Sequence, residues 1–235
     1  MNTPSNTDSA TERLIGSLAS DLAPVHRLRS PGVRAFTWLA GVVATAIVLA
    51  MIADVSALGH RLSAAPDMWL SATGSTLTAI LAAIAAFQLS MPDARRTWAL
   101  LPLPAALLWI VASGVGCLRT WFVPGTHPAD LSEARDCLIF IVGLSVPLSA
   151  LLIVMLRRAF SLQPELTALV AGLASAAAAA TLLNFFHPFD AAATDLAVHV
   201  FAVAIVIGAN WGLSGRLLAS NFLRKDVTRA VVRSN

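Results

Sequence analysis

The chain is predicted to be all-α: a polytopic membrane protein with six transmembrane helices and a short amphipathic helix before them. Its residues are 57% hydrophobic and 12% charged, whereas soluble proteins average about 25% charged residues. The apolar residues also gather in stretches of about the 20 residues with which a helix crosses a hydrocarbon core of about 30 Å. The predicted spans are about Ala35–Ala53, Met68–Met91, Thr97–Cys117, Cys137–Leu156, Leu166–Phe186 and Leu196–Gly215.

Charged residues lie in the loops and tails between these stretches, and the basic ones collect on alternate loops. One side receives thirteen Arg or Lys residues, and the other side receives only Arg61, Arg119 and Arg135. The positive-inside rule therefore predicts that both termini are cytoplasmic. The net charge of +3 is mostly juxtamembrane arginine, which favours contact with anionic membrane lipid over direct binding of nucleic acid.

Three parts follow from this topology. They are a cytoplasmic N-terminal segment (1–34), a six-helix membrane domain (35–215) and a basic cytoplasmic tail (216–235). Tryptophans near the predicted span ends agree with these boundaries, because an indole suits the membrane interface. These tryptophans are Trp38, Trp69, Trp98 and Trp211.

Glycine, alanine and proline predict how the spans pack. Small residues recur every four positions at Gly172, Ala176 and Ala180, and again at Gly208 and Gly212, a spacing that permits close helix contact in lipid. We expect both rows to pack inside one bundle rather than to form a dimerisation motif. Kinks are expected at the prolines of the third and fourth spans, which are Pro102, Pro104 and Pro147.

The spans carry little that suggests transport or catalysis. Proton relays and substrate sites use ionisable groups inside the bilayer, and the predicted span interiors hold no Asp, Glu, Lys or Arg. Gln88, Asn184, His199 and Asn210 are expected to be packing groups. No nucleophile, metalloprotease or phosphate-loop motif is present, so we do not expect an enzyme, and no resident cofactor is expected.

Both cysteines, Cys117 and Cys137, are predicted to face the side of the membrane opposite the termini. They can either form a disulfide, if their Cα atoms approach within about 7 Å, or remain separate small buried residues at helix ends. Histidines near the same face leave open a site for a soft metal ion such as zinc or cadmium. They are His60, His127, His187 and His199.

The N-terminal segment contains a short amphipathic helix at about Glu12–Ala23. Leu14, Ile15, Leu18 and Leu22 share one side of it. A helix of about ten residues is marginal alone in water. Its mixed acidic and basic polar face disfavours adsorption to anionic lipid. We therefore expect the apolar stripe to bind in a groove of a cytoplasmic protein.

Taken together, these features resemble the NrsF family of membrane anti-sigma factors. The resemblance covers most of the chain. It rests on Arg13-Leu14-Ile15, Leu18-Ala19, Leu22-Ala23-Pro24-Val25 and Leu28 ahead of the spans, on Cys137-Leu138-Ile139-Phe140-Ile141 through Pro147 to Leu156-Arg157-Arg158-Ala159-Phe160 and Pro164, on Ala171-Gly172-Leu173-Ala174-Ser175-Ala176, and on Phe186-His187-Pro188-Phe189-Asp190 with His199.

The resemblance implies a regulator in the bacterial inner membrane whose N-terminal segment occludes an extracytoplasmic-function sigma factor. It places partner contacts at Leu14, Ile15, Leu18, Leu22, Val25 and Leu28. It also implies two extracytoplasmic cysteines that sense oxidants or heavy metals. Cys137 matches the first. The second lies between helices five and six, where this chain has His187.

The resemblance therefore leaves two alternatives for the sensor. Either Cys117 replaces the missing cysteine, or Cys137 binds a metal ion together with His187 and His199. An alternative function is a small-molecule or metal-ion transporter in which Cys137, His187 and His199 line an outward-facing site. A further alternative is a membrane enzyme or assembly subunit whose N-terminal helix docks a neighbour.

Overall fold

The structure, a computed structural model, describes residues 6–20, 28–53, 56, 59, 66–122, 131–159, 161–183 and 200–213. This part of the chain is helical and contains no β-strand. In order, the elements are α1 (Asn6–Ser20), α2 (Pro31–Ile52), α4 (Pro66–Leu89), the 3-10 helix η1 (Arg96–Leu100), α5 (Leu103–Phe122), α6 (Leu131–Leu156), α7 (Pro164–Leu183) and the Val200–Leu213 helix.

Five helical segments are long and apolar enough to cross a membrane, which is consistent with membrane localisation. They are Pro31–Ile52, Trp69–Leu89, Arg96–Gly114, Arg135–Leu156 and Pro164–Leu183. They correspond to the first five predicted spans. The region of the sixth is described only as the shorter apolar helix Val200–Leu213, so a total of six spans stays a prediction.

Local chemistry explains where two of these helices begin. Ser30 caps α2 by accepting a hydrogen bond from the Val33 amide, and Pro31 occupies the first turn, where its missing N–H costs nothing. The helix therefore begins four residues before the predicted span. Pro102 lies at the break between η1 and α5, whereas α6 continues through Pro147.

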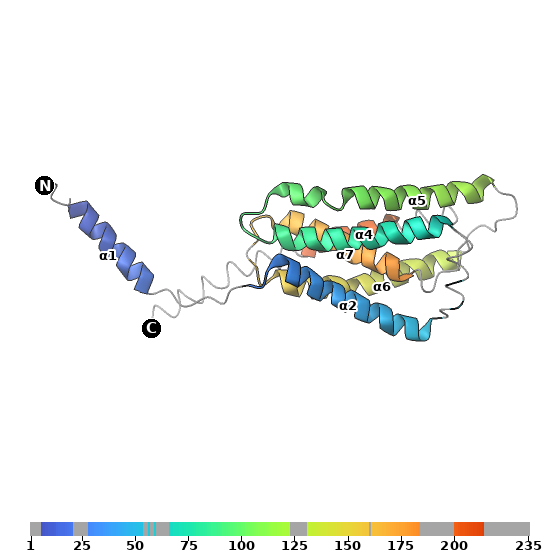
Figure 1. Cartoon of the computed structure of the whole chain (residues 1–235), viewed down its shortest axis with the longest axis horizontal. Helices are drawn as coiled ribbons and strands as arrows, with labels where there is room; N and C mark the ends of the chain where they lie inside the picture. The colour runs from blue at the N-terminus through green and yellow to red at the C-terminus, as the bar shows by residue number, and fades with distance from the viewer. Residues whose placement is uncertain are drawn as a thin grey trace.

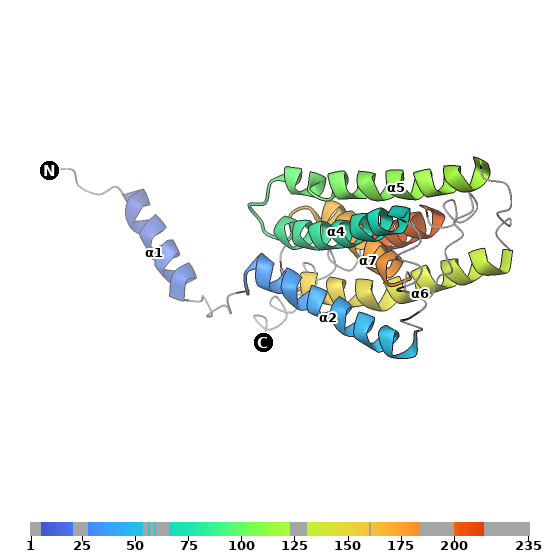
Figure 2. The ribbon, with the colours of Figure 1, turned by 45° about the vertical axis from the view of Figure 1, so that its right-hand side comes forward.

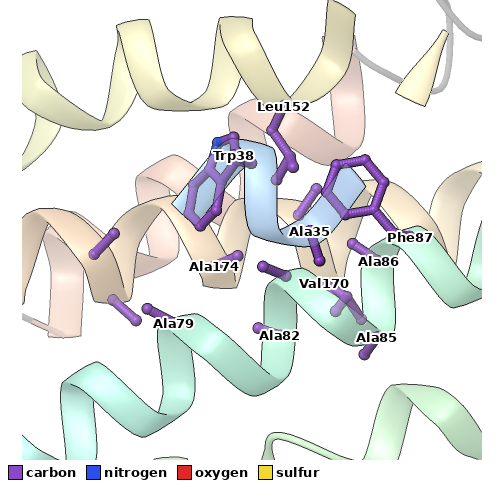
Figure 3. Packing of buried hydrophobic residues seen from close by; sticks show 14 of the residues in the cluster. Ala35, Trp38, Ala79, Ala82, Ala85, Ala86, Phe87, Leu152, Val170 and Ala174 are labelled. Atoms are coloured by element: carbon purple, nitrogen blue, oxygen red, sulfur yellow. The ribbon is translucent and has the colours of Figure 1, made fainter. Parts of the chain in front are cut away.

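The centre of the bundle is the contact between α4 and α7. Alanines of α4 meet alanines of α7 in a cluster that also contains Trp38, Phe87 and Leu152 (Figure 3). Two hydrogen bonds mark the ends of this antiparallel contact: Thr181 Oγ1 donates to Ser75 Oγ over 2.9 Å, and Thr167 Oγ1 donates to the Leu89 carbonyl over 3.4 Å. The other helices surround this pair (Figure 1).

α5 packs on α4, on the side away from α2 and α6 (Figures 1 and 2). A Cβ added to Gly74 would lie 2.8 Å from the backbone of Trp109. The absence of a side chain at Gly74 therefore allows the two helices to touch. One turn away, the hydroxyls of Ser71 and Ser113 are 3.1 Å apart and hydrogen-bond to each other.

The small-residue row of α7 lies inside the bundle, as predicted. Gly172, Ala176 and Ala180 are all buried, and a Cβ on Gly172 would lie 2.9 Å from Ile207 Cα. Gly208 and Gly212 behave differently. They are exposed, and an added Cβ would meet no atom within 4 Å, so in the described structure this second row takes no part in the bundle contacts.

Trp38 corrects the interfacial assignment of the tryptophans. Trp69, Trp98 and Trp211 are exposed, but Trp38 is completely buried. Its indole N–H donates to the Leu148 carbonyl of α6 over 3.1 Å, so this donor is satisfied by protein rather than by headgroups. Sequence proximity to a span end does not reveal that the ring faces a neighbouring helix.

The Gly74 contact makes a first prediction. Gly74→Ala should lower the free energy of unfolding by about 1–3 kcal/mol, because the new methyl overpacks against backbone atoms that cannot rotate away. Thermal unfolding in detergent, followed by circular dichroism, measures the change. Gly143→Ala is the matched control, since its methyl meets nothing within 4 Å; equal effects in both variants would contradict the packing argument.

Candidate functional site

α1 presents the predicted partner-binding residues. Leu14, Ile15 and Leu18 are each between 57% and 60% exposed, and α1 lies outside the bundle in both views (Figures 1 and 2). Leu28 is also exposed. Leu22 and Val25 lie outside the described residues. The structure therefore contains an apolar helical face that no described part of the bundle covers.

Cys137 occupies the inner face of α6, near the end that is remote from Met155. Its thiol is free and only 5% exposed. It belongs to a small cluster in which three helices meet: Ile141 from α6, Ala179 and Leu183 from α7, and Ala202 from the Val200–Leu213 helix. A reagent can reach this sulfur only if these helices separate.

For the other predicted sensor residues, the structure gives only the helix that carries Cys117 and does not describe its side chain. Cys117 belongs to α5, which packs on α4, whereas α6 packs on α7. His187 and His199 lie outside the described residues. Among the residues searched, which exclude both histidines, no group of three or more His, Cys, Asp or Glu side chains could hold a metal ion. A disulfide or a metal site at Cys137 stays a prediction.

Arg34 is a residue whose role the sequence did not reveal. It was grouped with the loop cations, yet it is 6% exposed. Its Nη1 donates to Ser90 Oγ over 3.2 Å, its Nη2 donates to the Met155 carbonyl oxygen, and its guanidinium lies 4.8 Å from the centre of the Phe87 ring. Arg34 thus joins the first turn of α2 to the ends of α4 and α6.

The burial of Arg34 could have been predicted from its position in the sequence, three residues after Pro31 and four after Ser30. Ser30 and Pro31 begin the helix, so Arg34 lies inside its first turn and shares a face with Trp38, four residues later. Arg34, Ala35 and Trp38 are the buried residues of α2. The fully buried contacts of α2 therefore lie in its N-terminal turns, and its packing on the core continues along the helix through the partly buried Leu39, Val42, Ala46 and Leu49.

Hydrogen bonds between two loops order the same end of the bundle. Ser161 Oγ donates to the Leu89 carbonyl over 3.2 Å, and Gln163 Nε2 donates to the Ala94 carbonyl over 3.4 Å. These contacts hold the loop after α6 against the loop after α4. Arg95, Arg96, Arg157 and Arg158 are exposed on those loops, so the basic residues gather where Arg34 is buried.

These features define a helical bundle that is long and apolar enough for a membrane and that carries an exposed N-terminal helix. The family model described as NrsF, negative regulator of sigma F, matches residues 18–224. The match covers most of the chain, and the chain therefore belongs to this family. Family membership implies a sigma factor as partner. No curated protein and no solved structure matches the chain.

The Arg34 contacts generate a second prediction. Arg34→Gln should lower the free energy of unfolding by about 2 kcal/mol, because the shorter amide cannot reach both acceptors and charge-assisted hydrogen bonds contribute about 1.5–3 kcal/mol. Denaturant unfolding in detergent measures the loss. Arg96→Gln removes an exposed cation instead and should change stability by less than about 0.5 kcal/mol. Equal losses would exclude Arg34 as a specific link.

Proposed function

We propose that this protein is an inner-membrane anti-sigma factor. In this proposal the N-terminal segment sequesters an extracytoplasmic-function sigma factor and releases it when Cys137 reacts with an oxidant or binds a soft metal ion. The family match supports the negative regulation of a sigma factor. The observation that carries the binding mechanism is the exposed apolar face of Leu14, Ile15 and Leu18 on α1.

Binding to a groove would explain why α1 carries this face. A helix of 15 residues gains little stability from hydrogen bonds alone in water, so helices of this kind usually depend on burial of an apolar stripe. Leu14 and Leu18 have the i, i+4 spacing, and Ile15 and Leu18 the i, i+3 spacing, of a helix that packs into a groove. Burial of these three side chains in a groove would remove their apolar surface from water, at about 25 cal/mol per Å².

We assign the Arg34 end of the bundle to the cytoplasm. The exposed arginines of the two ordered loops gather there, as the positive-inside rule requires of a cytoplasmic face, and they would meet anionic lipid. Both termini are then cytoplasmic. Cys137 lies on α6 eighteen residues before Met155, or about 27 Å away at 1.5 Å per residue, and so near the opposite face.

The burial of Cys137 supplies a physical basis for sensing. Metal capture or oxidation requires an accessible thiolate, and the sulfur is enclosed by α7 and the Val200–Leu213 helix. A reactant therefore favours a state in which these helices have moved apart. In a disulfide with Cys117, the two thiols would lose two protons and two electrons to the oxidant. Either reaction stabilises the opened packing relative to the closed one.

α6 provides the route to the N-terminal segment. The same helix carries Cys137 and the Met155 carbonyl, which accepts the hydrogen bond from Arg34. A shift of α6 would disturb this bond in the first turn of α2, which directly follows the partner-binding segment. A coupling of about 1–3 kcal/mol between the two ends would change sigma-factor affinity by about 5–150-fold.

The partner-binding proposal predicts that replacing the apolar side chains of Leu14 and Leu18 by small polar ones weakens binding of the sigma factor. In the full-length protein in nanodiscs, Leu14→Ser with Leu18→Ser should raise the Kd for an extracytoplasmic-function sigma factor of the same organism at least tenfold, since tenfold corresponds to about 1.4 kcal/mol. Calorimetry measures the affinity. Gly16→Ser introduces the same side chain on the opposite side of α1 and should leave Kd within twofold. Wild-type affinity in the double variant would remove α1 as the binding element.

The sensing proposal predicts loss of induction at Cys137. Cys137→Ser should abolish the rise in sigma-dependent transcription that an oxidant or cadmium causes, while repression without inducer is retained, because serine keeps the size of the side chain but not the thiolate. A transcriptional reporter measures both states. Ala179→Ser adds a hydroxyl to the same cluster and controls for polarity. A full response in Cys137→Ser would reject the thiol as the sensor.

A further inference from the structure

A buried polar group lies halfway along α6, apart from both Cys137 and Arg34. Ser145 is 1% exposed, and Ser149, one turn later, is also buried. The apolar window of this helix runs from Arg135 to Leu156, so Ser145 stands at its middle, where unpaired polar atoms are most costly. Ser145 Oγ has no hydrogen-bond partner among the described residues.

Asn210 approaches the same group from the Val200–Leu213 helix. Its Nδ2 donates to Ser149 Oγ over 3.0 Å and to the Val206 carbonyl over 2.8 Å. The Val206 oxygen can only accept, so it settles which end of the amide carries the hydrogens. Asn210 Oδ1 therefore makes neither of these two contacts. It too is buried and has no partner within the described chain.

α7 holds Asn210 in this position. A Cβ on Gly172 would lie 3.1 Å from Asn210 Cβ and 2.9 Å from Ile207 Cα. Only glycine leaves room for the Val200–Leu213 helix to approach so closely. The carboxamide is consequently confined between Gly172 and the serine face of α6, and its free oxygen cannot turn towards lipid without breaking both bonds made by Nδ2.

The two partnerless atoms have complementary hydrogen-bonding capacity, and both belong to the contact in which Asn210 bonds to Ser149. Side chains one turn apart on a helix are about 6 Å apart at Cβ, and Asn210 contacts the nearer serine directly. The carboxamide oxygen accepts hydrogen bonds, while the Ser145 hydroxyl can donate one and accept others. Buried groups of this kind nearly always find a partner, in protein or in ordered water. A buried water typically makes about three hydrogen bonds to otherwise unsatisfied polar groups, so one molecule can serve both atoms.

We infer that the contact of α6, α7 and the Val200–Leu213 helix contains a binding site for one water molecule. The water donates to Asn210 Oδ1 and accepts from Ser145 Oγ. Asn210 thereby engages two successive turns of α6, Ser149 directly and Ser145 through the water. The apolar contacts of this layer, such as Ala202 against Ile141, lack direction, so this polar site fixes the register of the two helices.

The test is whether the Ser145→Ala substitution lowers or raises the Tm of the full-length protein in detergent. If the water bridges the two atoms, Ser145→Ala lowers Tm by about 2–4 °C, since Asn210 Oδ1 loses a buried bridge. If Ser145 were truly unpartnered, the same change would leave Tm unchanged or raise it, because it removes an unsatisfied hydroxyl. Ser175→Ala is the matched control, as Ser175 Oγ donates only to the Ala171 carbonyl of its own helix.

Two further measurements complete the test. In an Asn210→Leu background, Ser145→Ala should cause no additional loss in Tm, because the partner of the bridge is already gone; additive losses would overturn the inference. Since Asn210→Leu can prevent folding, a high-resolution structure of the wild-type protein provides the second test. Density within hydrogen-bonding distance of both Ser145 Oγ and Asn210 Oδ1 supports the site. A map that shows other buried waters but none here overturns it.

Discussion

Close contact between α4 and α7 is the constraint on which the rest of the bundle depends. The five long apolar helices are consistent with a membrane location, and in a membrane the lipid chains are as apolar as the helices, so no hydrophobic force draws the helices together. Alanine faces let the two backbones approach closely enough for dispersion forces to act along the full helix length. The hydroxyl contacts of Ser75 with Thr181, and of Thr167 with Leu89, then set the register. The remaining spans arrange themselves around this pair.

α2 and the Val200–Leu213 helix are held to this pair in part by polar contacts, whereas α5 and α6 pack on it extensively. α2 depends on Arg34 and Trp38, whose donors are satisfied by acceptors on α4 and α6. The Val200–Leu213 helix depends on Asn210 and on the space left by Gly172. Outer helices of this kind are suited to movement, and under the proposed function they connect the thiol to the partner-binding segment.

Features that depend on local sequence were predicted well, whereas features that depend on contacts between distant segments were not. The first five spans were located to within several residues, because hydropathy and length are local properties. The bundle role of Gly172, Ala176 and Ala180 was also recognised, whereas Gly208 and Gly212 carry the same spacing and face outwards. From the sequence, Trp38 is predicted at the membrane interface and Arg34 at the end of the cytoplasmic N-terminal segment (1–34), whereas the structure buries both side chains. Both errors arise because the neighbours that bury these residues belong to α4 and α6, far away in the sequence.

The amino-acid sequence by itself determined that the chain is helical and where its first five apolar segments lie. Each of these depends on composition or periodicity within one segment. Only the tertiary structure decided which side of each span is buried, since a helix in lipid is apolar all round and its pattern does not distinguish protein from lipid contact. The buried thiol of Cys137, the links made by Arg34 and the polar site at Asn210 all depend on that choice of face.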